Sequence, residues 1–250
     1  MFFRNPEDSH AHSLQTLNWL YEHDDFMASV DTLVDLGCGA GLDLEWWATR
    51  TTRDEYAEPL NINCTGVDLL DTPAIARKYS NITYQKTDFE GKINTSKKKK
   101  YDVLWCHDAF QYVINPLETL KFWRSIAEPG AMLCLIVPQT TNLQHRNLSI
   151  IQPVGFHHYT LVNLIHMLAV AGWDCGSGFF LKQANDPWLH AVVYRGNVEP
   201  ADPKISWYEL ADSGLLPETA VASINKYGFL NQADLVLPWL DKNLIWYGNQ

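Results

Sequence analysis

The sequence has little basic charge and no long apolar run. Its 250 residues include 19 Lys and Arg against 29 Asp and Glu, which gives a formal net charge of −10. Nucleic-acid binding depends largely on basic residues that neutralise phosphates, so we expect no nucleic-acid partner. No segment approaches the roughly 18 apolar residues of a membrane span, and the acidic, proline-interrupted start does not resemble a secretory signal. We therefore expect a cytoplasmic protein without a membrane partner.

Basic residues are concentrated at one place, the four lysines at 97–100. This run lies between the polar residues 91–96 and an apolar segment that begins at Tyr101. Runs of like charge are most often solvated loops, and a phosphate-contacting loop is the alternative.

The sequence also lacks a C-x-x-C pair. Its five cysteines are far apart and odd in number, and most lie beside apolar runs: Cys38, Cys64, Cys106, Cys134 and Cys175. This usage is typical of small buried side chains in a reducing compartment rather than of a disulfide framework. The histidines do not have the ligand spacing of a zinc site, so we expect no metal centre.

Short apolar runs alternate along the chain with segments of helical periodicity. The runs predict strands at 32–36, 63–67, 82–86, 101–106, 131–137, 173–181 and 189–194. The periodic segments predict helices at 13–29, 42–49, 72–79, 116–127 and 160–171. This alternation predicts an α/β fold with a doubly wound, mostly parallel seven-stranded sheet and helices on both faces. The last two strands are expected to form a hairpin across 183–187.

Three parts follow from this pattern. Residues 1–30 form an N-terminal helical cap, 31–197 the sheet domain, and 198–250 an aromatic C-terminal extension with weakly helical segments around 207–211, 218–227 and 233–246. Aromatic side chains in the two appendages could line a pocket, or pack against the sheet edge or a second subunit as in a homodimer. The residues concerned are Trp19, Tyr21, Trp207, Tyr208, Trp239, Trp246 and Tyr247.

A glycine-rich turn, residues 35–41, joins the first strand to the helix that follows it. Its glycines let the backbone turn tightly and let a ligand lie against bare N–H groups. The spacing G-x-G-x-G differs from the G-x-G-x-x-G of dinucleotide-binding proteins. The acidic Asp35 that opens the turn suits an ammonium group, so the turn favours a nucleoside with an amino-acid tail. An ordinary strand–helix connection is the alternative.

Acidic residues also follow the next two strands. Asp68 ends the second strand, where a carboxylate can accept both ribose hydroxyls of a nucleoside. Asp88 follows the third strand and could face an adenine amino group, with Phe89 or Leu69 packed on the ring. The alternative is that both carboxylates are helix caps or turn residues.

Together these segments resemble the class I S-adenosylmethionine-dependent methyltransferases, and their small-molecule branch most of all. The matching pieces lie in order at 35–41, 66–68, 87–89, 101–113, 115–130 and 158–173. The resemblance implies that Asp35 and the glycines hold the methionine end of S-adenosylmethionine, Asp68 the ribose and Asp88 the adenine. The implied cofactor-binding residues are Asp35, Gly37, Cys38, Gly39, Gly41, Asp68, Leu69, Asp88, Phe89 and His107.

Methyl transfer from a sulfonium is an in-line displacement, so the protein mainly positions the nucleophile and needs a base only if that nucleophile must lose a proton. Candidate groups lie after the fourth strand, at 139–145 after the fifth, and before the next helix. The catalytic candidates are His157, His158 and His107, and the substrate contacts are Gln111, Tyr112 and His157. His107 could instead only cap its strand, and the second histidine of the pair could be structural.

Residues 107–110 lack the Asn/Asp-Pro-Pro-aromatic tetrapeptide that amide-nitrogen methyltransferases tend to carry at this place. With the acidic charge, this favours methyl transfer to a small-molecule acceptor. Two alternatives remain. One is another transferase on the same fold, such as a propylamine transferase, and the other is a catalytically silent interaction protein that still binds the cofactor.

Overall fold

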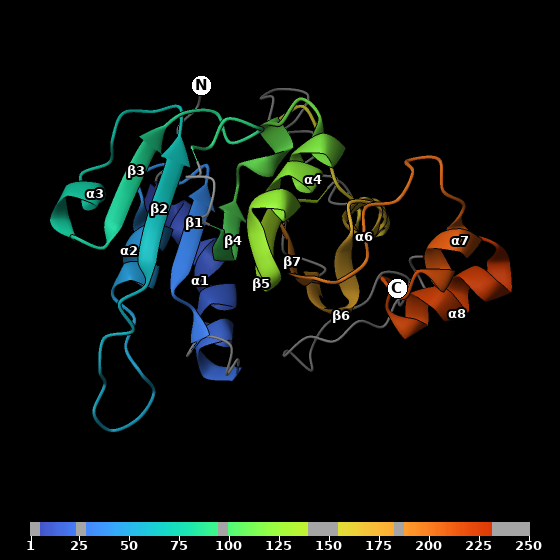
Figure 1. The fold of residues 1–250 in the computed structure, drawn as a ribbon, viewed down its shortest axis with the longest axis horizontal. Helices are drawn as coiled ribbons and strands as arrows, with labels where there is room; N and C mark the ends of the chain where they lie inside the picture. Colours follow the sequence, from blue (N-terminus) through green and yellow to red (C-terminus); the bar gives the residue numbers. More distant parts are fainter. Residues whose placement is uncertain (1–5, 24–28, 95–99, 140–154, 183–187, 232–250) are drawn as a thin grey trace.

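The computed structural model describes residues 6–23, 29–94, 100–139, 155–182 and 188–231. A seven-stranded sheet organises them in the order β3-β2-β1-β4-β5-β7-β6 (Figure 1). The first five strands in this order are parallel, and β7 is antiparallel to both of its neighbours. The strands are β1 (Thr32–Leu36), β2 (Asn63–Asp68), β3 (Ile82–Lys86), β4 (Tyr101–His107), β5 (Ala127–Pro138), β6 (Trp173–Lys182) and β7 (Trp188–Arg195). The predicted doubly wound, mostly parallel sheet is confirmed.

Helices cover both faces of this sheet. They are α1 (Pro6–His23), α2 (Leu42–Ala48), α3 (Ile75–Lys78), the 3-10 turn η2 (Phe110–Tyr112), α4 (Pro116–Ile126), α6 (Leu161–Val170), α7 (Trp207–Asp212) and α8 (Glu218–Tyr227). One hydrophobic cluster joins α1 and α2 to the sheet, and a second joins α4, α6, α7 and α8 to the opposite face.

Alternate residues of the central strands enter the two clusters. Leu33 and Met132 belong to the α1 and α2 side, whereas their neighbours Val34 and Leu133 belong to the α4 and α6 side. All four side chains are fully buried. Strands covered on both faces need apolar residues at every position, which explains the unbroken apolar run in β5.

Two predicted helices have different limits in the structure. Helix α1 spans Pro6–His23 instead of 13–29, and its first residue is a proline, which fits a first helical turn because its missing N–H is not needed there. Helix α3 covers Ile75–Lys78 only. Its first turn is joined to the preceding residues by tighter i to i−3 bonds, from the Ala76 N–H to the Pro73 carbonyl and from the Arg77 N–H to the Ala74 carbonyl.

Strand β5 begins earlier than the predicted 131–137. Tyr101 pairs with Ala127, but Val103 pairs with Met132, so the register shifts between these pairs. Gly130 lies within the shift at a φ of 78°. A bulge therefore carries the strand through a Pro-Gly sequence that the sequence pattern interpreted as a terminator.

Helices α7 and α8 extend beyond α6 at the β6 end of the sheet (Figure 1). Leu210 and Ile224 are fully buried in the same cluster as the α6 side of the sheet. The division at residue 198 and a homodimer through this extension stay predictions. Outside the described residues lie Lys97, Lys98 and Lys99, the loop segment 140–145, the hairpin turn 183–187 and the segment 233–246 with Trp239, Trp246 and Tyr247.

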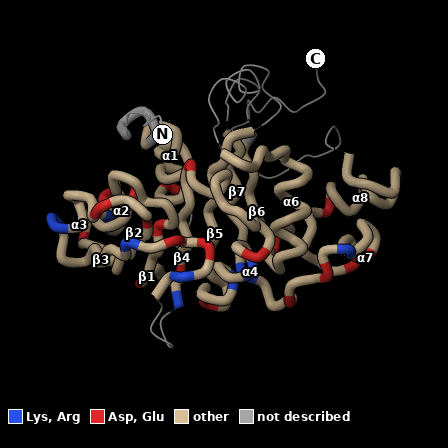
Figure 2. Tube along the Cα trace, turned by 90° about the horizontal axis from the view of Figure 1, so that it is seen from above, with Lys and Arg blue, Asp and Glu red and all other residues tan. Residues whose placement is uncertain are grey.

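Acidic positions are spread over the protein, and basic positions occur in small separate groups (Figure 2). This distribution agrees with the net charge of −10. Among the described helices, none is both long and apolar enough to cross a membrane.

Candidate functional site

A cavity of about 550 Å³ opens where β1, β2 and β4 end. The glycine turn at 37–41, residues 68–71, Phe89 and residues 107–109 form most of its wall, and α1 adds His10. Open parallel sheets bind ligands beyond the carboxyl ends of their strands, and this volume is within the usual range for small-molecule sites.

The glycine turn is held against β2 and the loop after β4. The N–H groups of Gly37 and Cys38 both donate to the Val67 carbonyl, at 2.8 and 3.1 Å. Gly37 and Gly39 have φ values of 84° and 50°, in the left-handed region that favours glycine. A Cβ on Gly37 would lie 2.3 Å from the Ala109 Cβ, whereas one on Gly39 would meet no atom within 4 Å. Gly37 therefore permits close packing, and Gly39 leaves the wall open.

These two glycines should differ in their effect on stability. Gly37→Ala should lower the free energy of unfolding by about 2–4 kcal/mol, because it adds a steric clash to the left-handed strain. Gly39→Ala, the matched control, should lower it by only about 1 kcal/mol. Urea denaturation of both variants measures the difference, and equal losses would contradict the assigned packing.

Asp68 is fixed at the mouth of the turn by two backbone donors. Its Oδ2 accepts a hydrogen bond from the Gly39 N–H at 2.8 Å, and its Oδ1 accepts one from the Leu70 N–H at 3.0 Å. A carboxylate oxygen has lone pairs for further donors, so both oxygens can also accept ligand hydroxyls.

Asp35 brings an unsatisfied polar atom to the cavity wall. Its side chain lines the cavity and is 2% exposed, and its Oδ2 has no hydrogen-bond partner among the described residues. Burial, and then the carboxylates of Asp43 and Asp68, raise the pKa of Asp35 well above its ordinary value. A cationic ligand group placed here would supply the missing partner.

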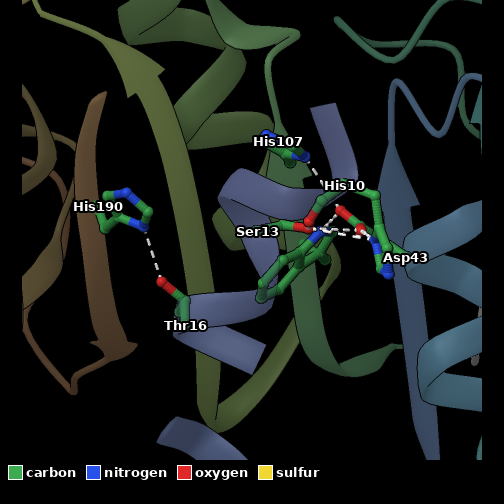
Figure 3. Close-up of polar contacts among 7 residues, drawn as sticks. His10, Ser13, Thr16, Asp43, His107 and His190 are labelled. Atoms are coloured by element: carbon green, nitrogen blue, oxygen red, sulfur yellow. Dashed lines mark hydrogen bonds and ion pairs between the residues drawn. The ribbon is translucent and has the colours of Figure 1, made fainter. Parts of the chain in front are cut away.

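Asp43 lines the cavity and connects the three elements α1, α2 and β4 (Figure 3). From α1, the Ser13 hydroxyl donates to its Oδ1 at 2.6 Å, and the His10 Nδ1 lies 2.5 Å from the same oxygen. From β4, the Trp105 indole N–H donates to Oδ2 at 2.9 Å, and the His107 Nδ1 lies 3.1 Å from it.

Two opposing influences act on the pKa of Asp43. Burial alone would raise it, but hydrogen bonds from His10, His107 and Ser13, together with the charge of His107, lower it far below its ordinary value. Asp43 is therefore a buried carboxylate that four donors stabilise.

The sequence did not reveal Asp43, His10 or Ser13 as site residues. Asp43 looked like an ordinary acidic residue in a first helical turn, where such residues are common. His10 and Ser13 lie 33 and 30 positions away from it in the sequence. In the sequence, His10 and Ser13 are visible only as polar residues near the start of an amphipathic segment. That position alone does not indicate a ligand site.

The structure places most of the predicted cofactor residues on the cavity wall. Phe89 is fixed there because its carbonyl accepts a hydrogen bond from the Trp123 indole N–H at 2.9 Å. Leu69 is 66% exposed, so its side chain is free to contact a ligand. The predicted residues that line the cavity are Asp35, Gly37, Cys38, Gly39, Gly41, Asp68, Leu69, Phe89, His107 and Tyr112.

Two predicted site residues have other places. Asp88 does not line the cavity, and its Oδ1 accepts a hydrogen bond from the Glu90 N–H at 2.8 Å. Gln111 is fully buried and is also absent from the wall. Its side-chain amide donates to the Asp108 carboxylate at 2.6 Å, and Asp108 has a left-handed φ of 54°. Gln111 thus supports the turn that follows His107, because it is directed to this turn and not to the cavity.

His157 and His158 lie outside the described cavity wall. His157 is half-buried with its ring 6.4 Å from that of Tyr159, and His158 is exposed. Their catalytic roles, and the substrate contact of His157, stay predictions. Of the three catalytic candidates, the structure brings only His107 to the cavity.

Other predicted features concern packing. The rings of Trp19 and Phe179 are 4.8 Å apart, and those of Trp207 and His166 are 4.6 Å apart, so these aromatic residues pack within the fold. All five cysteines are buried, and burial is the first cause that raises the pKa of Cys64 to about 12. In the described part of the chain, no group of three or more His, Cys, Asp or Glu side chains is placed to hold a metal ion.

Fold and site together define a Rossmann-like α/β protein with an acidic ligand cavity at the carboxyl end of its sheet. A family model described as a methyltransferase domain matches residues 22–177, which is more than half of the chain. The protein therefore belongs to this methyltransferase-domain family.

Individual relatives are distant. The chain is 27% identical over 125 residues to the ubiquinone biosynthesis O-methyltransferase of Saccharophagus degradans, a match that covers 48% of each protein. The chain thus spans about half the length of this curated relative.

Solved structures show the same fold at low sequence identity. An O-methyltransferase family protein from Burkholderia thailandensis is 16% identical, with a TM-score of 0.56, over 75% of this chain and 57% of that one. A 1,6-didemethyltoxoflavin-N1-methyltransferase from the same species, solved with 1,6-didemethyltoxoflavin and S-adenosylhomocysteine, is 12% identical. Its TM-score is 0.50 over 79% of this chain and 93% of that one.

Proposed function

We propose that this protein transfers the methyl group of S-adenosylmethionine to a small-molecule acceptor by in-line displacement. The observation that carries the proposal is the buried, unpaired Oδ2 of Asp35 on the wall of the cavity, beside the glycine turn. Family membership supports the same activity.

The residues of the cavity fit this cofactor. Asp35 would hold the ammonium group of the methionine part, and Asp68 would accept the ribose hydroxyls. Leu69 or Phe89, which both line the cavity, would pack on the adenine ring. Three carboxylates close to the cavity, those of Asp35, Asp43 and Asp68, influence one another electrostatically and favour a cationic ligand.

The cofactor, when bound, supplies a methyl group on a positively charged sulfur. The protein's part is to orient the acceptor and to exclude water from it. His107 and Tyr112 line the cavity and would make this contact. A cavity of about 550 Å³ suits a small acceptor, and the names of the ubiquinone and toxoflavin relatives support that class.

Calorimetric titration with S-adenosylmethionine, followed by mass spectrometry of turnover mixtures, tests the proposal. We expect saturable one-to-one binding, release of S-adenosylhomocysteine, and an acceptor that gains one CH₂ unit. A product that gains a propylamine group would indicate the alternative transferase. Binding with no turnover of any acceptor would indicate an interaction protein, and absence of heat at high micromolar cofactor would refute the proposal.

A further inference from the structure

One ring nitrogen of His107 is held by a carboxylate, and the other is buried without a partner among the described residues. Its side chain is 7% exposed, and its Nε2 has no hydrogen-bond partner among the described residues. The residue lines the cavity, and its Nδ1 lies 3.1 Å from the Asp43 carboxylate. The Trp188 ring packs edge-on against the imidazole at 5.8 Å, which restricts its rotation.

The partner of Nδ1 determines which nitrogen carries the proton. Asp43 is ionised, and an ionised carboxylate only accepts hydrogen bonds. Nδ1 must therefore donate to it, as the Trp105 indole N–H also does. In the neutral imidazole the lone pair is then on Nε2, the nitrogen that has no partner.

Asp43 is itself held rigidly. Its Oδ1 is occupied by Ser13 and His10 of α1, and its Oδ2 by two groups of β4 (Figure 3). A carboxylate fixed on both oxygens cannot rotate away from the imidazole. This is the arrangement of a base and its orienting group, in which a third residue fixes the tautomer of the histidine.

We propose that His107 is the general base for an aromatic hydroxyl acceptor, and that Asp43 is the residue that positions it. This proposal rests on the proposed methyltransferase function. In the step, the acceptor O–H bond breaks and its proton passes to Nε2 of His107. The oxygen electron pair forms the bond to the methyl carbon, and the pair of the carbon–sulfur bond goes to the sulfur. The products are an aryl methyl ether, the neutral thioether and an imidazolium that returns its proton to water.

The chemistry of the site selects this acceptor class. A neutral amine already has a free electron pair and needs no base, whereas an aromatic hydroxyl, with a pKa near 10 as in tyrosine, becomes a good nucleophile only as it loses its proton. The aromatic side chain of Tyr112 shares the cavity with His107 and can pack against a planar ring.

The test uses the full-length protein and the variants His107→Gln and Asp43→Asn, with His166→Gln as the matched control. His166 packs on Trp207 and does not line the cavity. Methyl transfer is measured to a panel of ring-substituted phenols, from phenol to 4-nitrophenol, at a slightly alkaline pH at which only the latter is largely ionised. Calorimetry gives the affinity of each protein for S-adenosylmethionine, and ¹⁵N NMR gives the tautomer of His107.

We expect His107→Gln to lower kcat for phenol about 10²–10⁴-fold and to affect 4-nitrophenol much less, because an ionised acceptor needs no base. Asp43→Asn should also lower kcat for phenol, and should move the His107 proton from Nδ1 to Nε2. In His107→Gln, cofactor affinity should fall far less than kcat for phenol, and His166→Gln should match the wild type in both measurements.

Several results would overturn the proposal. They are equal losses for all phenols in His107→Gln, a large loss of cofactor affinity in that variant, or transfer to none of the phenols by wild-type protein that binds the cofactor. If the wild type does not bind the cofactor, the proposed function fails. In that case the NMR measurement still tests whether Asp43 positions His107. A neutral wild-type His107 with its proton on Nε2 would refute that role of Asp43.

Discussion

Replacing Asp68 by alanine should weaken S-adenosylmethionine binding about 100-fold or more. The carboxylate would accept both ribose hydroxyls, and hydrogen bonds to a charged group contribute about 1.5–3 kcal/mol each. The variant also loses the acceptor for the Gly39 and Leu70 N–H groups, which loosens the turn that carries the cofactor. Calorimetric titration measures the affinity directly.

Asp71→Ala is the matched control for this experiment. Asp71 also lines the cavity, but its side chain is 95% exposed and pairs with Lys86. Its removal should change affinity less than about threefold, because exposed ion pairs contribute little. Equal affinities of Asp68→Ala and the wild type would contradict the assigned ribose contact.

Replacing Asp35 by asparagine should stabilise the cofactor-free protein and weaken cofactor binding at the same time. The carboxyl group is buried, has an unpaired oxygen and lies near two other carboxylates, so its ionised form is disfavoured. Asparagine removes this charge with little change in shape. We expect a rise in melting temperature of about 2–4 °C, which corresponds to roughly 1 kcal/mol for a chain of this size, and an affinity loss of about 10-fold or more.

The stability gain of Asp35→Asn should increase with pH. Because the folded protein raises the pKa of Asp35, this group contributes stability that is fully present below its ordinary pKa and is lost as pH rises through the raised value. Asp35→Asn does not lose this stability as pH rises. Thermal unfolding of the variant and the wild type at pH 5 and pH 8 measures the difference in stability. A difference that is equal or smaller at pH 8 would contradict a raised pKa of Asp35.

Asp43→Asn serves as the comparison for Asp35→Asn, because we expect it to lower the stability of the protein instead of raising it. The pKa of Asp43 is lowered in the folded protein, so its contribution to stability is present above the ordinary pKa and is lost as pH falls through the lowered value. Asp43→Asn should therefore destabilise the protein at neutral pH. Asp35→Asn and Asp43→Asn, two similar substitutions in one cavity, should thus change the free energy of unfolding in opposite directions.

The sheet was predictable because its signals are local. The strand Thr32–Leu36 has the same limits in the sequence pattern and in the structure, since apolar residues bounded by a glycine turn leave few alternatives. The early start of β5 was not predictable. The start depends on the pairing of Ala127 with Tyr101 of β4, on the far side of a bulge. A contact with a neighbouring strand cannot be read from the local sequence of β5.

The site followed from the sequence only in part. Asp35 and Asp68 lie near the carboxyl ends of neighbouring parallel strands, so their positions at one edge of the sheet followed from topology alone. Asp43 acquires its role from contacts with α1 and β4, which are far away in the sequence. His107 could be placed at the cavity from its position at the end of β4, but the orientation of its ring depends on Asp43 and Trp188.

The assigned cofactor site can be tested with a crystal structure of the protein in complex with S-adenosylhomocysteine. We expect the product to lie in the cavity with its ribose hydroxyls on Asp68, its amino group close to Oδ2 of Asp35, and its sulfur on the side of the cavity that His107 lines. A product bound elsewhere, or one with its amino group away from Asp35, would contradict the assigned site.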